Sequence, residues 1–390
     1  MNIELIKELL DKVYANSNDS HNIYTPLELC EEMINSLSDL SGDILVISNL
    51  EFLIVLKSKI GLDKVHYTTS CDIKKQVAIS LGINVNNIYD LEYNNKEINL
   101  GIEEMKFDVI IQNPPYNPNN LWKNFVEKGI SLLKDDGQML AIHPEIYRIE
   151  KRYDNFLLSL IKGLKELHIL KSGVFGKSVG VSVDWYLYSK QNQKNFNIYY
   201  HNKNTEILKN TEIDRIFEFD TKSIQNSILN KITKKNYHNG FKSCCLSNTE
   251  FYDNNELGVY KQCGGKKNGT GWTTGKFNLT LNPTKYQFED KVVMSYVRQP
   301  RAKYFSKEDA VGVVVAFYWL TNNKSLPILL NSKMIWKLHL EIVSYNTGAK
   351  NINAWFLSSL NFDNLNVQTE EELYAHYNLT QEEINWIKNV

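Results

Sequence analysis

The stretch Phe107-Asp108-Val109-Ile110-Ile111-Gln112-Asn113-Pro114-Pro115-Tyr116 says most about this chain. Its first part is an apolar run of strand length, and it leads directly into four residues that favour a loop. Consecutive prolines fix φ and remove amide donors, so the Pro114 carbonyl and the Asn113 side-chain oxygen are presented as acceptors in one geometry. Tyr116 adds a flat face on which another ring can stack. These residue types also make ordinary turns, but the strand context and all four letters together favour a functional site.

Short apolar runs alternate with helical segments on both sides of this stretch. The pattern predicts a helix at 122–133, a turn at Asp135-Asp136-Gly137, and strands at 44–47, 64–68, 108–111, 139–143, 167–170 and 181–188. The last strand alternates between polar and apolar residues, which is typical of an antiparallel neighbour. Strands that alternate with helices indicate a parallel sheet covered on both faces. The sequence therefore predicts a mostly parallel, doubly wound α/β domain.

The length of 390 residues exceeds what one ordinary core requires, so two domains are expected. After about residue 195, Lys and Asn become frequent and glycines cluster. We predict a first domain at 1–195, a connector at 196–240 and a mixed α+β domain at 241–390 that ends in helices. Thr25 before Pro26 is typical of a helix cap. Thr380 to Glu383 has the form of a capping box at the start of the last helix.

Charge and cysteine content exclude few classes of function. The chain has 44 basic and 45 acidic residues, a balance that neither supports nor excludes a nucleic-acid partner. Five cysteines without zinc-like spacing argue against both a zinc site and a disulfide framework. The sequence has no long apolar stretch for a membrane span, and its first ten residues lack the basic start of a leader peptide. A cytoplasmic protein without a metal is the expectation.

With these pieces in order, the chain resembles the N6-adenine DNA methyltransferases of restriction–modification type, with the catalytic domain first and target recognition last. The resemblance is specific at Asn113 to Tyr116 and loose elsewhere. It implies S-adenosylmethionine as cofactor, double-stranded DNA as partner, and a cognate restriction endonuclease as a further partner. Asn113 and Pro114 would accept the two hydrogens of the adenine amine and so free its lone pair. Tyr116 would stack on the flipped base.

Phe175 is the second aromatic residue that the resemblance singles out. The segment Val174-Phe175-Gly176 precedes the strand 181–188 and is similar to the family loop whose aromatic side chain faces the flipped base. Phe175 and Tyr116 would then enclose adenine. Base flipping costs a few kcal/mol, and two stacking faces are of the right size to offset it. A Phe at a strand entrance is also an ordinary core residue, so both interpretations stay open.

The cofactor site departs from the family pattern. Family members place an acid and glycines after the first strand, whereas Val46 to Phe52 contains no glycine, so a ligand cannot approach this main chain as closely. The resemblance implies a Thr on the cofactor's carboxylate, polar contacts from the turn, an acid on the ribose and an acid near the cofactor's adenine. The corresponding candidates are Thr25 for the carboxylate, Ser48, Asn49 and Glu51 for the turn, Asp72 for the ribose and Asp90 for the adenine. A helix cap or a solvated surface acid is the ordinary alternative.

Two basic segments of the second domain are candidate DNA contacts. The loop 261–274 is flexible in composition and basic, but it fails the register of a P-loop. The segment 296–304 interleaves cations with aromatic residues more densely. The predicted DNA-binding residues are Lys266, Lys267, Arg298, Arg301 and Lys303. A solvated hairpin and surface ion pairs are the alternatives.

Three other interpretations correspond to parts of the sequence. Asp220-Thr221-Lys222 has the form of a metal-nuclease motif, but no separate strand supplies a second acid, so it is taken as a charged surface run. RNA and protein-glutamine methyltransferases share the proline motif. The missing glycines also suit a chain that has lost catalysis and now acts as a DNA-binding or inhibitory subunit.

Overall fold

The structure is a computed structural model of the 390-residue chain. It describes residues 10, 12–15, 23–94, 97–102, 104–116, 121–148, 151–170, 173–175, 182–200, 204–209, 216–217, 220–234, 239–245, 260–263, 277–280, 286–294, 301–313, 315–342 and 354–389. The chain forms two compact units, Met1–Arg148 with Arg152–Ile216, and Ile149–Lys151 with Phe217–Val390.

The first unit is built on a nine-stranded sheet with the order β11-β10-β8-β9-β7-β6-β1-β2-β3. Most neighbours pair in parallel, and β9 runs antiparallel between β7 and β8. This confirms the predicted mostly parallel sheet. The strands are β1 (Ile44–Ile47), β2 (Val65–Thr69), β3 (Ile88–Asp90), β6 (Phe107–Gln112), β7 (Leu133–Pro144), β8 (Leu164–Ile169), β9 (Val183–Ser189), β10 (Asn195–Tyr199) and β11 (Thr205–Lys209). A small hairpin, β4 (Glu92–Tyr93) and β5 (Ile98–Asn99), stands apart from this sheet.

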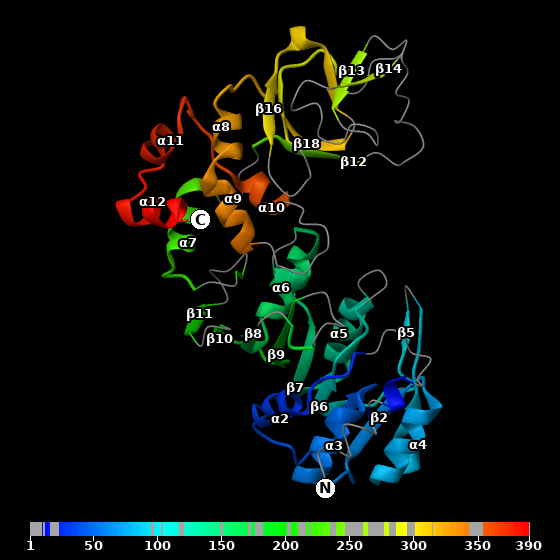
Figure 1. Ribbon diagram of the computed structural model, residues 1–390. Helices are drawn as coiled ribbons and strands as arrows, with labels where there is room; N and C mark the ends of the chain where they lie inside the picture. Colours follow the sequence, from blue (N-terminus) through cyan, green and yellow to red (C-terminus); the bar gives the residue numbers. More distant parts are fainter. Residues whose placement is uncertain are drawn as a thin grey trace. The chain divides into compact units, whose positions relative to one another are not determined.

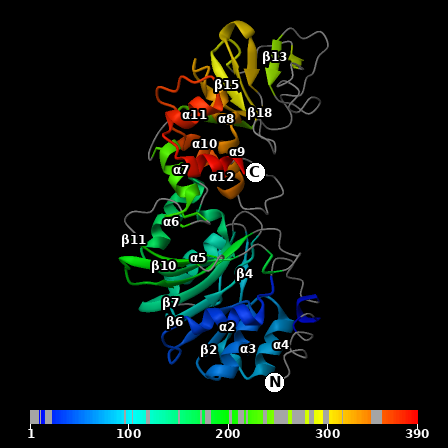
Figure 2. The same ribbon diagram turned by 60° about the vertical axis from the view of Figure 1, so that its left-hand side comes forward.

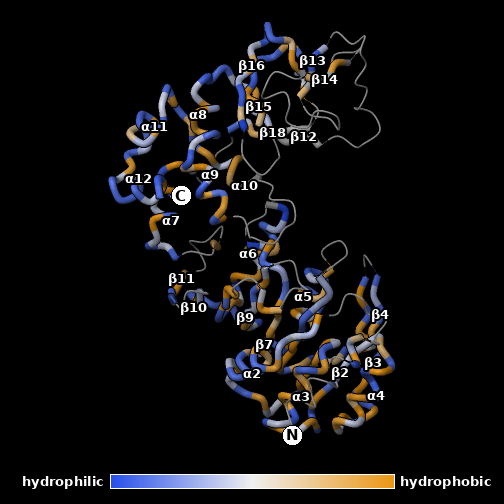
Figure 3. The backbone as a smooth tube through the Cα atoms, viewed as in Figure 1, coloured by the Kyte–Doolittle hydropathy of each residue, from blue (hydrophilic) through white to orange (hydrophobic). Residues whose placement is uncertain are grey.

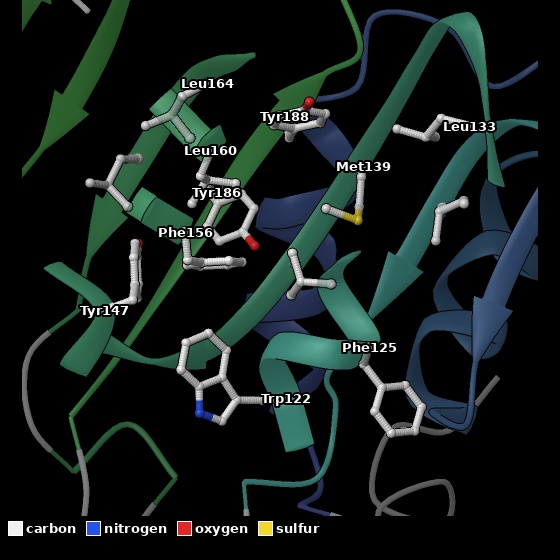
Figure 4. Packing of buried hydrophobic residues seen from close by; sticks show 14 of the residues in the cluster. Trp122, Phe125, Leu133, Met139, Tyr147, Phe156, Leu160, Leu164, Tyr186 and Tyr188 are labelled. Atoms are coloured by element: carbon white, nitrogen blue, oxygen red, sulfur yellow. The ribbon is translucent and has the colours of Figure 1, made fainter. Parts of the chain in front are cut away.

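Helices cover both faces of the sheet because successive strand residues point to opposite sides. In β1, Val46 joins the core under α2 (Leu27–Asn35), α3 (Leu50–Lys59) and α4 (Asp72–Leu81), which lie together in Figures 1 and 2. Leu45 instead joins the core under α5 (Leu121–Leu132) and α6 (Asp154–Ile161). Figure 4 shows this second core, in which Trp122 and Phe156 pack beside Tyr186. The doubly wound prediction is confirmed.

Two local predictions were wrong. Asp135-Asp136-Gly137, expected as a turn, lies inside β7, where Leu133 pairs with Phe107 and Gln138 with Val109. Residues 134–137 of β7 have no pairing partner in β6, so the register of the two strands shifts there, as at a β-bulge. Thr25 does not cap α2, because Pro26 occupies the N-cap position and no side chain caps the helix.

The second unit is mixed α+β, as predicted. It contains a four-stranded antiparallel sheet, β12-β18-β15-β16, and a three-stranded sheet, β14-β13-β17. Hydrophilic and hydrophobic residues alternate along its helices (Figure 3), and the apolar ones are buried. The strands are β12 (Phe241–Cys245), β13 (Tyr260–Cys263), β14 (Asn278–Thr280), β15 (Lys291–Met294), β16 (Ala302–Phe305), β17 (Val311–Val313) and β18 (Val315–Leu320). The helices are α7 (Ile224–Ile232), α8 (Leu326–Asn331), α9 (Lys333–Ile342), α10 (Ala354–Ser359), α11 (Glu370–His376) and α12 (Gln381–Lys388).

Two further points bear on the predicted organisation. Thr380 and Glu383 form the predicted capping box of α12. The segment 196–240 is divided between the units, since β10 and β11 belong to the first sheet and α7 to the second unit. Within the described ranges, every helix is too short or too polar to cross a lipid bilayer.

Candidate active site at the end of β6

The candidate site lies where two neighbouring parallel strands end. Ile47, the last residue of β1, pairs with Gln112, the last residue of β6, so Ser48 and Asn113 leave the sheet side by side. The strand order reverses at this place, because the chain continues from β1 to β2 on one side and returns as β6 on the other. Open α/β sheets bind their ligands at such a switch point, outside the carboxyl ends of the strands.

The side chain of Asn113 is held in one orientation. Its Nδ2 donates to the Ile23 carbonyl and to Thr25 Oγ1, both at 3.0 Å, and its backbone N–H donates to Asn49 Oδ1 at 2.9 Å. The Ile23 carbonyl can only accept, so the amide nitrogen must face it and Oδ1 must point the other way. Oδ1 is buried and has no hydrogen-bond partner among the described residues. The fold thus leaves one buried acceptor unused.

Tyr116 and Phe175 lie next to each other, although they come from different loops. Their ring centroids are 6.4 Å apart and the planes are inclined by 83°, an edge-to-face contact. Both side chains are buried, and burial raises the pKa of the Tyr116 phenol well above its usual value, so the phenol stays neutral. Two aromatic rings that enclose a base must lie with their faces parallel. The predicted sandwich therefore requires the ring of Tyr116 or Phe175 to turn.

Glu51 is the buried charge of this region. Its carboxylate accepts from the Tyr14 hydroxyl at 2.5 Å, from the Thr25 N–H at 2.7 Å and from Asn49 Nδ2 at 3.4 Å. Burial raises the pKa of Glu51, and the hydrogen bonds from Tyr14 and Thr25 counteract that rise. From the sequence, Glu51 was expected only as a polar contact of the cofactor turn, together with Ser48 and Asn49. The available signal was an acid inside the apolar run Leu50 to Leu56.

Lys74 is a second buried charged residue, which the sequence analysis missed. Its side chain is fully buried at the start of α4, and Nζ lies 3.2 Å from the Ser48 carbonyl and 4.5 Å from the centre of the Tyr14 ring. Its positive charge lowers the pKa of Glu51. Since Lys74 is followed directly by Lys75 in α4, no sequence pattern distinguished it.

The turn between β1 and α3 is short and conformationally unusual. Only Ser48 and Asn49 separate the strand from the helix. Ser48 has φ of 68°, in the left-handed region that favours glycine. Its N–H still bonds to the Thr68 carbonyl at 2.8 Å, which ties the turn to the next strand.

The two acids predicted to contact the cofactor lie together at the ends of the next strands. Asp72 is the first residue of α4 and Asp90 the last residue of β3. Both form ion pairs with Lys75, at 3.1 Å for Asp72. Their side chains are 92% and 76% exposed. Both carboxylates are therefore accessible from solvent. Exposed ion pairs of this kind add little to stability.

Of the predicted DNA contacts, the structure describes two. Arg301 is exposed immediately before β16, and Lys303 is exposed on that strand with Nζ 5.4 Å from the centre of the Phe305 ring. Lys266, Lys267 and Arg298 lie outside the described residues.

The acid–x–lysine segment has a local role. The Asp220 side chain accepts from the Lys222 N–H at 3.0 Å, and the Asp220 carbonyl accepts from the Ser223 hydroxyl at 2.7 Å. Ser223 then caps α7. These bonds build the turn that begins α7.

A buried ionic cluster at the same edge of the sheet was also missed. Arg148 Nε donates to Asp184 at 2.5 Å, one terminal nitrogen to Glu145 at 2.7 Å and the other to the Ile216 carbonyl at 2.9 Å. Burial raises the pKa of Asp184 to about 6, although Arg148 counteracts this and Glu145 adds to it. The available signal was a lone acid within the apolar strand 183–188.

The sequence matches no protein-family model and no curated protein. Several solved structures resemble part of the chain. The methyltransferase subunit of a type I restriction–modification system from Streptococcus thermophilus is 17% identical over 45% of this chain and 46% of its own, with a TM-score of 0.36. A modification subunit of a putative type I restriction enzyme from Vibrio vulnificus is 12% identical over 50% of each chain, with a TM-score of 0.39.

A putative class I S-adenosylmethionine-dependent methyltransferase from Listeria monocytogenes is 14% identical over 48% of this chain and 67% of its own, with a TM-score of 0.35. The matches cover about half the length of the first two structures. At these TM-scores the likeness carries no statement about substrate or partner.

Proposed function

We propose that this chain is an S-adenosylmethionine-dependent DNA methyltransferase that modifies N6 of a flipped adenine. One observation supports this more than any other. Asn113 Oδ1 is buried and unpaired at the carboxyl edge of the sheet, while both hydrogens of the same carboxamide are taken by Ile23 and Thr25. An unpaired buried acceptor costs about 1–3 kcal/mol, and a bound amine donor would remove that cost.

The proposed chemistry follows from the acceptor. The lone pair of an aromatic amine is delocalised into the ring, so the amine is a weak nucleophile. Hydrogen bonds from its two N–H groups to Asn113 Oδ1 and the Pro114 carbonyl would pull the nitrogen toward a tetrahedral shape and free the lone pair. Preorganised dipoles of this kind are most effective where water is excluded, and Asn113 is 1% exposed. Tyr116 and Phe175 would hold the base.

The residues present fit the amino-acid end of S-adenosylmethionine. Glu51 and Lys74 supply opposite buried charges, complementary to an ammonium and a carboxylate, and Glu51 lies within two hydrogen bonds of Asn113. Asp72 and Asp90 are accessible carboxylates at the next strand ends for hydroxyl and amine groups. When bound, the cofactor supplies a methyl group on a positively charged sulfur. The protein's task is then to align the amine with it.

The second unit is the proposed DNA-recognition part. Arg301 and Lys303 are exposed cations on or beside the edge strand β16, suited to phosphate contact. Lys266, Lys267 and Arg298 belong to the same proposal from the sequence. Arg side chains could in addition read guanine edges.

The test compares Asn113→Ala with the surface variant Asn86→Ala. We expect Asn113→Ala to lower the single-turnover rate of methyl transfer to adenine in duplex DNA about 100- to 1,000-fold, because one preorganised dipole is lost. Its affinities for S-adenosylhomocysteine and DNA should match those of the unmodified protein. Asn86→Ala should keep the full rate. Retained methyl transfer in Asn113→Ala would remove Asn113 from the catalytic role.

A second function is favoured by the turn after β1. It has two residues and no glycine, and the protein's own groups already bind Glu51. A chain that no longer binds the cofactor would serve as a DNA-binding or inhibitory subunit. Calorimetry with S-adenosylhomocysteine separates the two functions. Micromolar binding supports the enzyme, and absence of binding at high micromolar ligand together with retained DNA affinity supports the subunit.

A further inference from the structure

The hydrogen bonds around Asn113 indicate which residues orient its side chain. This inference deepens the proposed function and rests on it. We propose that Thr25, Asn49 and Glu51 are positioning residues that hold the Asn113 carboxamide with its oxygen turned toward the substrate amine. The turn after β1 would then help to position Asn113, whose oxygen accepts a hydrogen of the substrate amine. All three residues were expected from the sequence to contact the cofactor. The inference changes the role of Thr25 and Asn49, and it gives Glu51 a second role beside the one proposed for the cofactor's ammonium.

The Ile23 carbonyl determines which end of the carboxamide faces the substrate, and Thr25 holds the carboxamide in place. A carboxamide can rotate by half a turn at little steric cost, which exchanges its oxygen and nitrogen. Here the Ile23 carbonyl and Thr25 Oγ1 both receive hydrogens from Nδ2, each at 3.0 Å. Rotation would place Oδ1 against the Ile23 carbonyl, two acceptors in contact, and would break that bond, whereas the Thr25 hydroxyl could then donate to Oδ1. The Ile23 carbonyl therefore opposes the orientation that presents a donor to the substrate, and the bond to Thr25 fixes the position of the carboxamide.

Asn49 and Glu51 fix the backbone segments that carry Asn113 and Thr25. Asn49 Oδ1 receives the Asn113 backbone N–H at 2.9 Å, which fixes the start of the proline loop. Glu51 accepts from the Thr25 N–H at 2.7 Å and from Asn49 Nδ2 at 3.4 Å, so one carboxylate contacts both residues that contact Asn113. The network is closed within the protein.

Burial makes this network stiff. Thr25, Asn49 and Glu51 are all 0% exposed, so water cannot replace a lost bond. A buried carboxylate is costly unless hydrogen bonds compensate it, and Glu51 also receives the Tyr14 hydroxyl. The same bonds would stabilise the fold in any case. A test must therefore separate orientation of Asn113 from stability and from cofactor binding.

The main comparison is Thr25→Val against Thr25→Ser. Valine keeps the shape of threonine and removes the acceptor, whereas serine keeps the acceptor. We expect Thr25→Val to lower the single-turnover rate of methyl transfer about tenfold at saturating cofactor, the factor that corresponds to one lost hydrogen bond. Its affinity for S-adenosylhomocysteine should stay within threefold. Thr25→Ser should restore most of the rate.

Thr233→Val is the matched control. It removes a threonine hydroxyl bond of 2.7 Å to the Leu229 carbonyl in the second unit, so it reports the general cost of such a loss. Its methyl-transfer rate should be unchanged. If Thr25→Val instead loses cofactor affinity and keeps its rate at saturation, Thr25 is a cofactor ligand and the inference is wrong.

A second readout does not depend on activity. In protein labelled with ¹⁵N-asparagine, the side-chain amide signals of Asn113 are identified by their loss in Asn113→Ala. We expect their hydrogen exchange to be at least tenfold faster in Thr25→Val than in the unmodified protein, and to return in Thr25→Ser. Unchanged exchange would overturn the inference. If the unmodified protein neither binds S-adenosylhomocysteine nor methylates DNA, the proposed function fails, and the exchange result still decides the role of Thr25.

Discussion

At the scale of single residues, a few buried polar groups distinguish this molecule from a structural α/β domain. Asn113, Thr25 and Glu51 are all buried, and of these three only Asn113 has a side-chain acceptor without a hydrogen-bond partner among the described residues; Gln112 Oε1, next to it in the chain, also has none. A fold optimised for stability alone pairs or removes such groups. The unpaired Oδ1 of Asn113 is the basis of the proposal that this residue binds a ligand donor.

Asp184 carries a prediction about pH. Burial raises the pKa of Asp184 to about 6, and the neighbouring Glu145 carboxylate adds to the rise, while the Arg148 guanidinium that both carboxylates share counteracts it. The unfolded chain has the usual lower pKa, so the folded state binds a proton more strongly. This contribution to stability is fully present below about pH 4 and is lost as the pH rises through about 6.

Asp184→Asn should remove that dependence, because asparagine accepts a hydrogen bond without a charge. The free energy of unfolding, measured in urea at pH 5 and pH 8, should fall more for the unmodified protein than for the variant. The difference should reach about 1–3 kcal/mol, from a shift of about two pKa units. Equal pH dependence of the two proteins would show that Asp184 does not titrate in this range.

At the scale of elements, the turn between β1 and α3 is the strained part of the site. Ser48 takes φ of 68°, which costs a residue with a side chain about 1–3 kcal/mol relative to an allowed conformation. The parallel pairing of β1 with β2 and β6 and the buried first half of α3 hold it in place. Because only two residues connect β1 to α3, the turn cannot adopt another backbone conformation that would relieve the strain.

Ser48→Gly and Ser48→Val should therefore change stability in opposite directions. Glycine adopts positive φ without strain, so we expect the free energy of unfolding to stay unchanged or to rise by up to about 1 kcal/mol. Valine is β-branched and disfavours this conformation, so a loss of about 1–3 kcal/mol is expected. Urea unfolding of both variants tests this. A glycine variant less stable than the valine variant would contradict the argument.

At the scale of the whole molecule, each unit has cores of its own. Leu53 of α3 lies in a core made only of first-unit residues, and Leu338 of α9 lies in a core made only of second-unit residues. A unit with its own core is expected to unfold cooperatively by itself. Two calorimetric transitions should follow.

Leu53→Ala and Leu338→Ala should each lower the midpoint of a different transition, because each creates a cavity that costs about 2–5 kcal/mol in one unit. Scanning calorimetry of the two variants provides the measurement. Should both substitutions shift one common transition by similar amounts, the units unfold together and the expectation is wrong.

The sequence alone predicted the class of the first unit and much of its central sheet. Short segments at 44–47, 64–68, 108–111 and 181–188 predicted β1, β2, β6 and β9 to within two residues, whereas β3, β10 and β11 were not predicted as strands of the sheet. Strand and helix patterns repeat over short distances, so they can be read locally. The irregularity in β7 was missed because acids and a glycine suit a turn and a bulge equally well.

The tertiary structure decided the contacts of the site. Asn113 was selected from its motif, but its orientation depends on Ile23 and Thr25, about ninety residues earlier in the chain. The edge-to-face contact of Tyr116 and Phe175 likewise joins two separate loops. A motif specifies which chemical groups are available, whereas their direction depends on packing between distant segments, which no local pattern encodes.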